Sequence, residues 1–285
     1  MSTYLDTLKA LLPERFRADR PVVPVVRLKG AIGMGSPLRP SLTLASVAPV
    51  LEKAFSTKRA KEVAIVVDSP GGSPVQAHLI YKRIKALAAE KELGVTVFVE
   101  DVAASGGYMI ACAGDEIVAD PSSIVGSIGV VSAGFGFDRA IERLNVDRRL
   151  YTSGENKAIL DPFSPEKPED VARLKELQRE IHESFIALVK ESRGSSLSDD
   201  PELFTGAFWT GATGVGLGLV DRVGEVREIL RERWGAKVEL RAITPRTSLL
   251  KRLTGRGGGE GAAAGIAEGA LDALETRSLW ARYGL

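Results

Sequence analysis

Three turns in the sequence combine glycine with serine in a way that suits nucleophilic catalysis. They are residues 68–73 (DSPGGS), 103–108 (AASGGY) and 125–129 (VGSIG). Each reads as a strand-to-turn junction, and open α/β sheets bind ligands beyond the carboxyl ends of their strands. Glycine has no Cβ, so backbone N–H groups in such turns can approach a substrate closely. The pattern therefore predicts one site assembled from the three turns.

Ser105 is the strongest candidate nucleophile. It follows an apolar strand, precedes two glycines and is placed to open a helix. The helix dipole and its first N–H groups would face any developing negative charge, and Gly71 or Gly72 could supply a second donor to an oxyanion hole. The alternative interpretation is that Ser105 only caps the helix.

A serine nucleophile needs a base, and the sequence offers two kinds. His78 and His182 both lie within predicted helices, not at the loop tips or strand ends where the histidine of a Ser–His–Asp triad usually lies. A lysine can serve if burial lowers its pKa from about 10.4 toward roughly 7–8. Lys157 is unusual among the lysines, because it follows a turn and precedes the apolar residues 158–160. Taken alone, a lysine in such a place is more often a surface residue.

Strands and helices alternate along the chain. Apolar runs predict strands at 22–28, 63–67, 95–99, 117–119, 129–132 and 149–151. Helical periodicity predicts helices at 41–61, 75–89 and 168–191, and a short helix opening near Ser105. This alternation favours an α/β layered fold with parallel strands joined by right-handed crossovers.

Composition limits the possible functions and divides the chain. With 285 residues and a net charge of +1, the chain has no excess of positive charge that would attract nucleic acid. We expect an amphipathic segment at 1–20, a catalytic domain at 21–240, and a flexible linker with a tail helix at 255–285. The lone Cys112 lies among apolar residues and is predicted to be buried. No apolar run reaches the roughly 18 residues of a membrane-spanning helix, so a cytoplasmic or membrane-peripheral location is expected.

Five segments occur in a characteristic order between about residues 22 and 235. They are VVRLKGAI, DSPGGS, VAASGGYMIACAGDEIVADPSSIVGSIGVV, YTSGENKAILDPFSP and FWTGATGVGLGLVDRVG. Together they resemble the signal peptide peptidase A family of serine peptidases, which has the Clp protease/crotonase-like fold. Many relatives also carry an N-terminal membrane anchor, for which this sequence shows no segment.

The resemblance implies a Ser–Lys dyad with Ser105 as nucleophile and Lys157 as general base. It further implies that Ser127 orients the lysine and that Gly72 and Gly106 form the oxyanion hole. The implied reaction is hydrolysis of hydrophobic, signal-peptide-like peptides through an acyl-enzyme, without a metal or other cofactor. Relatives with one catalytic domain form rings, so we expect a homo-oligomer in which Lys157 reaches the serine of a neighbouring subunit.

Two rival functions share the predicted fold. A crotonase-like acyl-CoA enzyme would use the same oxyanion donors, but such enzymes usually place carboxylates at the reacting carbon, where this sequence has serine and glycine. A non-catalytic scaffold is the other rival, and the presence of both Ser105 and Lys157 argues against it. The tail raises a further hypothesis: Leu279, Trp280 and Tyr283 could reach a peptide groove across the linker and inhibit the enzyme, although docking elsewhere is the simpler alternative.

Overall fold

Parallel strands dominate the structure, a computed structural model that describes residues 20–33, 41–154, 156–244 and 277–284. The sheet has the strand order β6-β5-β3-β2-β1-β8, with β4 paired to β3 and β7 paired to β4. Among the strand pairs of these described residues, only β5–β6 is antiparallel. The strands are β1 Val22–Lys29, β2 Glu62–Ser69, β3 Gly94–Ala104, β4 Glu116–Ala119, β5 Ile124–Gly126, β6 Phe208–Thr210, β7 Arg222–Val223 and β8 Glu239–Ile243.

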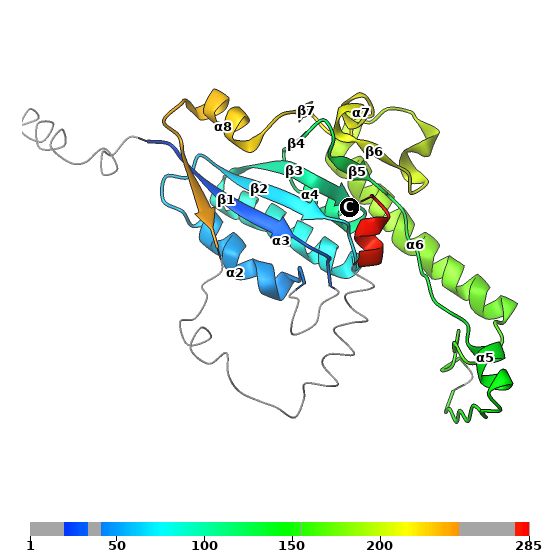
Figure 1. The fold of residues 1–285 in the computed structure, drawn as a ribbon. Coiled ribbons are helices and arrows are strands. Elements are labelled where there is room, and N and C mark those ends of the chain that lie inside the picture. The colour runs from blue at the N-terminus through cyan, green and yellow to red at the C-terminus, as the bar shows by residue number, and fades with distance from the viewer. Residues whose placement is uncertain (1–19, 34–40, 155, 245–276, 285) are drawn as a thin grey trace, which may run out of the picture.

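Helices cover both faces of the sheet, and most of them lie on one face. The larger hydrophobic core joins the sheet to α2, α3, α4 and the end of α6, and a smaller core lies under α8 (Figure 1). The helices are α2 Leu44–Phe55, α3 Pro74–Lys91, α4 Gly106–Ala111, α5 Asp138–Arg143, α6 Pro168–Arg193, α7 Gly211–Gly216 and α8 Val226–Trp234, with short 3₁₀ turns at Gly194–Ser196 and Pro201–Phe204. The α/β fold class with parallel strands and crossover helices is therefore confirmed.

The apolar runs of the sequence explain the central strands. Every residue of β2 is buried, as expected for a parallel strand covered on both faces. β3 is longer than predicted, because its first half pairs with β4 and its last three residues, 102–104, pair with β5. This second pairing carries the chain beyond the core to the turn that contains Ser105.

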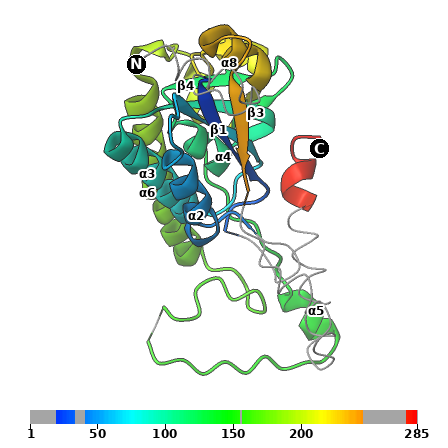
Figure 2. The same cartoon turned by 90° about the vertical axis from the view of Figure 1, so that its left-hand side faces the viewer.

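Residues 129–167 form an arm that projects from the sheet, as Figures 1 and 2 show. No residue of α5 is buried, and the long helix α6 that leads back is buried only toward its C-terminal end. There Arg193 is buried and makes two hydrogen bonds to the Asp221 carboxylate, at 2.7 and 3.0 Å, and one to the carbonyl of Gly218. This ion pair fixes the base of α6 to the segment between α7 and β7.

Two predicted strands are wrong. Residues 129–132 and 149–151 lie in irregular parts of the arm. A strand needs a neighbouring backbone for its hydrogen bonds, and β5 already ends at Gly126, so these apolar residues have no described strand to pair with. The predicted N-terminal segment falls almost entirely outside the described residues, as does the linker, and residues 277–281 of the tail are helical.

Candidate active site

Ser105 occupies the sharp turn between β3 and α4. Its backbone has φ +52° and ψ −121°, a conformation that residues with a side chain rarely adopt and that costs on the order of 1–3 kcal/mol. Its N–H donates to the carbonyl of Gly126 at 2.8 Å, and its carbonyl accepts from the N–H of Met109. The Ser105 hydroxyl makes no capping hydrogen bond to α4. Capping therefore does not explain this serine, whose side chain is half-buried and free to react.

The glycine turn after β2 packs against Ser105. A Cβ on Gly71 would lie 2.8 Å from the Ser105 Cβ and 3.0 Å from the Gly106 nitrogen, so a side chain there would clash. Gly72 has φ +137°, and a Cβ on it would lie 2.1 Å from the Ile32 carbonyl oxygen. The close approach of two backbones at this point requires glycine at both positions.

Two backbone N–H groups at this junction remain available. The Ile32 N–H donates to the carbonyl of Gly71, and the Ile32 carbonyl accepts from the N–H of Ser73. The N–H of Gly72, between these two residues, therefore lies on the opposite side of the extended segment. The N–H of Gly106 is the first in α4, where the helix offers no acceptor. Within the described part of the chain, neither N–H has a backbone partner. Of the two predicted oxyanion donors, Gly106 therefore follows Ser105 directly, and Gly72 belongs to the glycine turn that packs against Ser105.

Ser127 lies beside Ser105, because the residues that precede them, Gly126 and Ala104, are paired across β5 and β3. Ser127 also has a positive φ, of +52°, and its N–H donates to the carbonyl of Ala207. Two serines on adjacent strand ends, both in a strained conformation, thus mark one point at the sheet edge.

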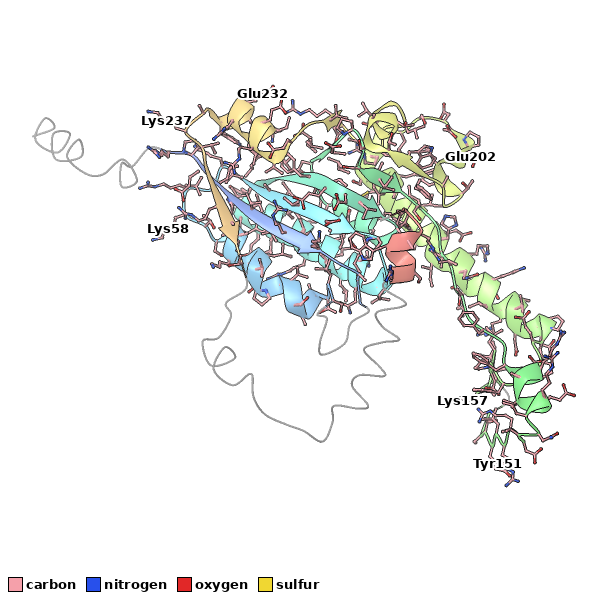
Figure 3. All side chains as sticks on the ribbon, viewed as in Figure 1. Lys58, Tyr151, Lys157, Glu202, Glu232 and Lys237 are labelled. Atoms are coloured by element: carbon pink, nitrogen blue, oxygen red, sulfur yellow. The ribbon has the colours of Figure 1, made fainter. Side chains whose placement is uncertain are left out.

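Lys157 lies away from these serines within a single chain. It is exposed near the end of the arm, close to Tyr151 (Figure 3), whereas Ser105 begins α4 in the sheet body. The structure therefore brings together Ser105, Ser127, Gly72 and Gly106, and leaves Lys157 apart. A lysine base from the same chain would require the whole arm to be placed differently.

The two histidines do not form a triad with Ser105. His78 is exposed on α3, where its ring stacks on Tyr81. His182 Nε2 lies 2.9 Å from the carbonyl oxygen of Ile128, so this nitrogen is bound to backbone and not to a serine hydroxyl. Among the described residues, no group of three or more His, Cys, Asp or Glu side chains could hold a metal ion.

The C-terminal tail also reaches the site. The Tyr283 hydroxyl lies 3.1 Å from Ser127 Oγ, and the ring packs edge-on against Phe208 at 5.1 Å between centroids. Tyr283 packs with Val102 and Ala104 at the end of β3. Sequence reasoning missed Phe208, because only the antiparallel pairing of β6 with β5 brings it here and no local pattern signals that pairing.

The fold resembles that of a solved peptidase. A mutant of the 1510-N membrane-bound stomatin-specific protease, in complex with a substrate peptide, superposes with a TM-score of 0.51 over 83% of this chain and 97% of that chain, at 17% identity. At this identity the likeness shows the fold alone. None of the described helices is both long and apolar enough to cross a lipid bilayer.

Sequence comparison finds relatives with several names. A Brucella abortus protein named Na(+)/H(+) antiporter NhaA is 57% identical over an alignment of 286 positions, which covers 98% of this chain and only 39% of that protein. A Synechocystis sp. protein named as a candidate protease is 31% identical over 211 residues, 71% of this chain and 75% of that protein. Serine protease SPPA of Arabidopsis thaliana chloroplasts is 31% identical over 84% of this chain and 37% of that protein.

The chain thus spans about two fifths of the Brucella relative, whose name describes transport and not the matched part. The matching family model is more specific: Peptidase family S49 matches residues 87–238, a range that contains Ser105, Ser127 and Lys157. More than half of the chain lies in this match, and the Synechocystis relative matches over three quarters of its own length. The chain belongs to peptidase family S49.

Proposed function

We propose that this chain is a serine endopeptidase that cleaves hydrophobic, signal-peptide-like segments with a Ser–Lys dyad. Its catalytic unit lies within residues 21–240. Ser105 is the nucleophile, Lys157 the general base, and Ser127 the residue that orients the lysine. The N–H groups of Gly72 and Gly106 form the oxyanion hole. A cytoplasmic or membrane-peripheral location remains part of the proposal.

One observation carries the proposal: Ser105 is held with φ +52° at the start of α4, with its hydroxyl free, against a turn in which only glycine fits. A strained, half-buried serine beside two N–H groups without a backbone partner is an arrangement that suits acyl transfer. A scaffold would gain nothing from the strain, since a glycine at position 105 would adopt this backbone more easily.

The arm supports an assembly in which the dyad forms between subunits. Its apolar side chains are exposed to an extent that is unusual for a monomer: Phe135 is 80% and Tyr151 90% exposed, and Leu177 and Ile181 of α6 are also exposed. A second copy of the chain that packed on this surface would bury these side chains together with Lys157. Loss of water around a lysine favours its uncharged amine, which can act as a base.

The proposed reaction then proceeds by proton and acyl transfer. The uncharged Lys157 amine takes the proton of the Ser105 hydroxyl as Oγ attacks the peptide carbonyl carbon. The oxyanion accepts hydrogen bonds from Gly72 and Gly106, the C–N bond breaks, and the lysine returns its proton to the leaving amine. Water, deprotonated by the same lysine, then attacks the acyl carbon; the bond to Oγ breaks, Oγ takes the proton back from the lysine, and the peptide acid is released.

Complementation tests both the residues and the shared site. Ser105→Ala and Lys157→Ala subunits are inactive separately; unfolded together and refolded, they should recover up to about a quarter of wild-type peptide hydrolysis, because one in four interfaces of a randomly mixed ring then carries an intact dyad. The matched control mixes Lys157→Ala with the double variant, which restores no dyad. Recovery no greater than in this control contradicts a dyad shared between subunits.

A further inference from the structure

The last described residues of the chain, Arg277–Gly284, enter the candidate active site instead of leaving it open. Tyr283 is 9% exposed although it lies two residues from the end of the chain, and it packs with the buried side chains Val102 and Ala104. Ile124 and Trp280 complete this small cluster, which is separate from both large cores. Figure 1 shows the tail helix beside β5, at the edge of the sheet where the catalytic turns lie.

The pocket around Tyr283 is formed by the same strand ends that carry the two serines. Val102 and Ala104 are the last residues of β3 before Ser105 that lie outside the larger core, which takes Ala103 between them, and Ile124 belongs to β5, which leads to Ser127. Phe208 of β6 closes one side with its ring edge-on to Tyr283. A side chain held here is therefore next to the reacting bond of any peptide that acylates Ser105.

The chemistry of the pocket matches an aromatic side chain with one polar end. Its walls are aliphatic or aromatic, and its polar group is the Ser127 hydroxyl, which the Tyr283 hydroxyl meets at 3.1 Å. Tyrosine buries its ring in such a site and keeps its hydroxyl hydrogen-bonded. Tyr283 and Ile124 also line a larger cavity of about 820 Å³ on the sheet face, where an extended peptide could continue. The lining of this cavity is mixed, with apolar residues such as Phe98 and Leu240 and charged residues such as Arg27 and Glu100.

We infer that this pocket, formed by Val102, Ala104, Ile124, Phe208 and the Ser127 hydroxyl, is a specificity subsite for aromatic side chains of peptide substrates, and that the tail occupies it through Tyr283 as an internal competitor. The inference rests on the proposed peptidase function. Because Tyr283 bonds Ser127, the docked tail also holds the hydroxyl that is proposed to orient Lys157. Peptide binding and completion of the dyad both require the tail to leave.

Peptide affinity tests the tail without catalysis. In the full-length Ser105→Ala background, binding of a fluorescent apolar peptide with one central tyrosine is measured for Tyr283→Ala, Tyr283→Phe and the exposed control Arg282→Ala. Release of a tail that is docked for most of the time should tighten the apparent affinity about three- to tenfold in Tyr283→Ala. Tyr283→Phe keeps the ring and should gain less, and Arg282→Ala should equal its parent. Equal affinity of Tyr283→Ala and Arg282→Ala, or no binding to any variant, overturns the inference.

A second measurement tests the subsite. In the Tyr283→Ala background, the tyrosine peptide should bind more tightly than the same peptide with alanine, and Phe208→Ala should reduce this preference while circular dichroism confirms an unchanged fold. Equal binding of the two peptides rejects the subsite. With Ser105 intact, Tyr283→Ala should lower KM and leave kcat unchanged. If no variant hydrolyses peptide, the proposed function fails, whereas the binding measurements still decide the position of the tail.

Discussion

The sheet body and the arm differ in almost every physical respect, although the proposed dyad needs one residue from each. In the body, Ser105 is fixed by hydrogen bonds to neighbouring strand ends and by glycines that permit no side chain. In the arm, Lys157 lies exposed among exposed apolar residues. The comparison teaches that the body alone positions the proposed nucleophile and oxyanion donors, whereas the proposed base would need the surface of a second chain to complete the dyad.

The largest effect on activity is expected from a substitution in the arm, and this substitution should leave stability unchanged. Lys157→Ala should reduce peptide hydrolysis by at least about a thousandfold, because the serine loses its base. The free energy of unfolding should change by less than about 0.5 kcal/mol, since Lys157 is exposed. Lys167→Ala, another exposed lysine at the end of the arm, is the control and should retain activity. Activity of Lys157→Ala within tenfold of this control would remove the lysine from the mechanism.

A glycine substitution in the body should affect both activity and stability. Gly72→Ala puts a Cβ into the Ile32 carbonyl at a φ of +137°, so it should destabilise the protein by about 1–3 kcal/mol and displace an oxyanion donor. Gly134→Ala in the arm meets no atom within 4 Å and should change neither. Chemical denaturation and hydrolysis rates, measured together, check the pair. An active, fully stable Gly72→Ala would contradict the close approach of the two turns.

The apolar surface of the arm should control assembly. Phe135→Ser removes an exposed aromatic side chain and should weaken association about tenfold or more, as measured by sedimentation at several concentrations. Val215→Ser, at an exposed apolar position on α7, is the control and should leave association unchanged. Activity should fall with association in Phe135→Ser and recover at high protein concentration. A chain that sediments as a monomer with full activity would contradict the shared dyad.

The smallest effect is expected from thiol reagents. Burial raises the pKa of the Cys112 thiol to about 12, so at pH 8 only about one molecule in ten thousand carries the reactive thiolate. Iodoacetamide should leave native protein unlabelled and its rate unchanged, and should label it rapidly in denaturant. The unfolded thiol ionises near pH 9 and the folded one does not, so this group's contribution to stability is lost as the pH rises above 9. Rapid native labelling would place Cys112 at the surface.

The body could be predicted from sequence because its signals are local. Continuous apolar runs predicted the ends of β1 and β2 to within two residues. Because strand ends in a parallel sheet meet at one edge, the sequence also predicted one site that contains Ser105 and Ser127. The prediction that Lys157 lies apart from Ser105 within one chain agrees with the structure. Its role as base remains a prediction.

In the arm, the same reasoning from apolar runs predicted strands that do not form, for a physical reason. Residues 129–132 and 149–151 have the composition of strands. A strand, however, needs a neighbouring backbone to pair with, and the described chain provides none at these positions. The helix predicted at 168–191 is present as α6, yet its apolar residues Leu177 and Ile181 are exposed, and only the last part of that helix meets the core. The contact of Phe208 with Tyr283 joins segments separated by a long linker, and no spacing rule predicts such a contact.

The ion pair between Arg193 and Asp221 holds the C-terminal end of α6 to the sheet body, and the N-terminal end projects with the arm. The helix has 26 residues, so it is about 39 Å long, and it contacts the sheet body from His182 to Arg193. A rotation of 10° about His182 would move the first residue of the helix, about 21 Å away, by about 4 Å, which is more than the length of a hydrogen bond. Helix α6 by itself therefore cannot hold the Lys157 amine within hydrogen-bond distance of a Ser105 hydroxyl. Contacts at the projecting end of α6 must therefore fix the position of the arm. In an assembly, each subunit would set the position of its neighbour's Lys157 relative to Ser105.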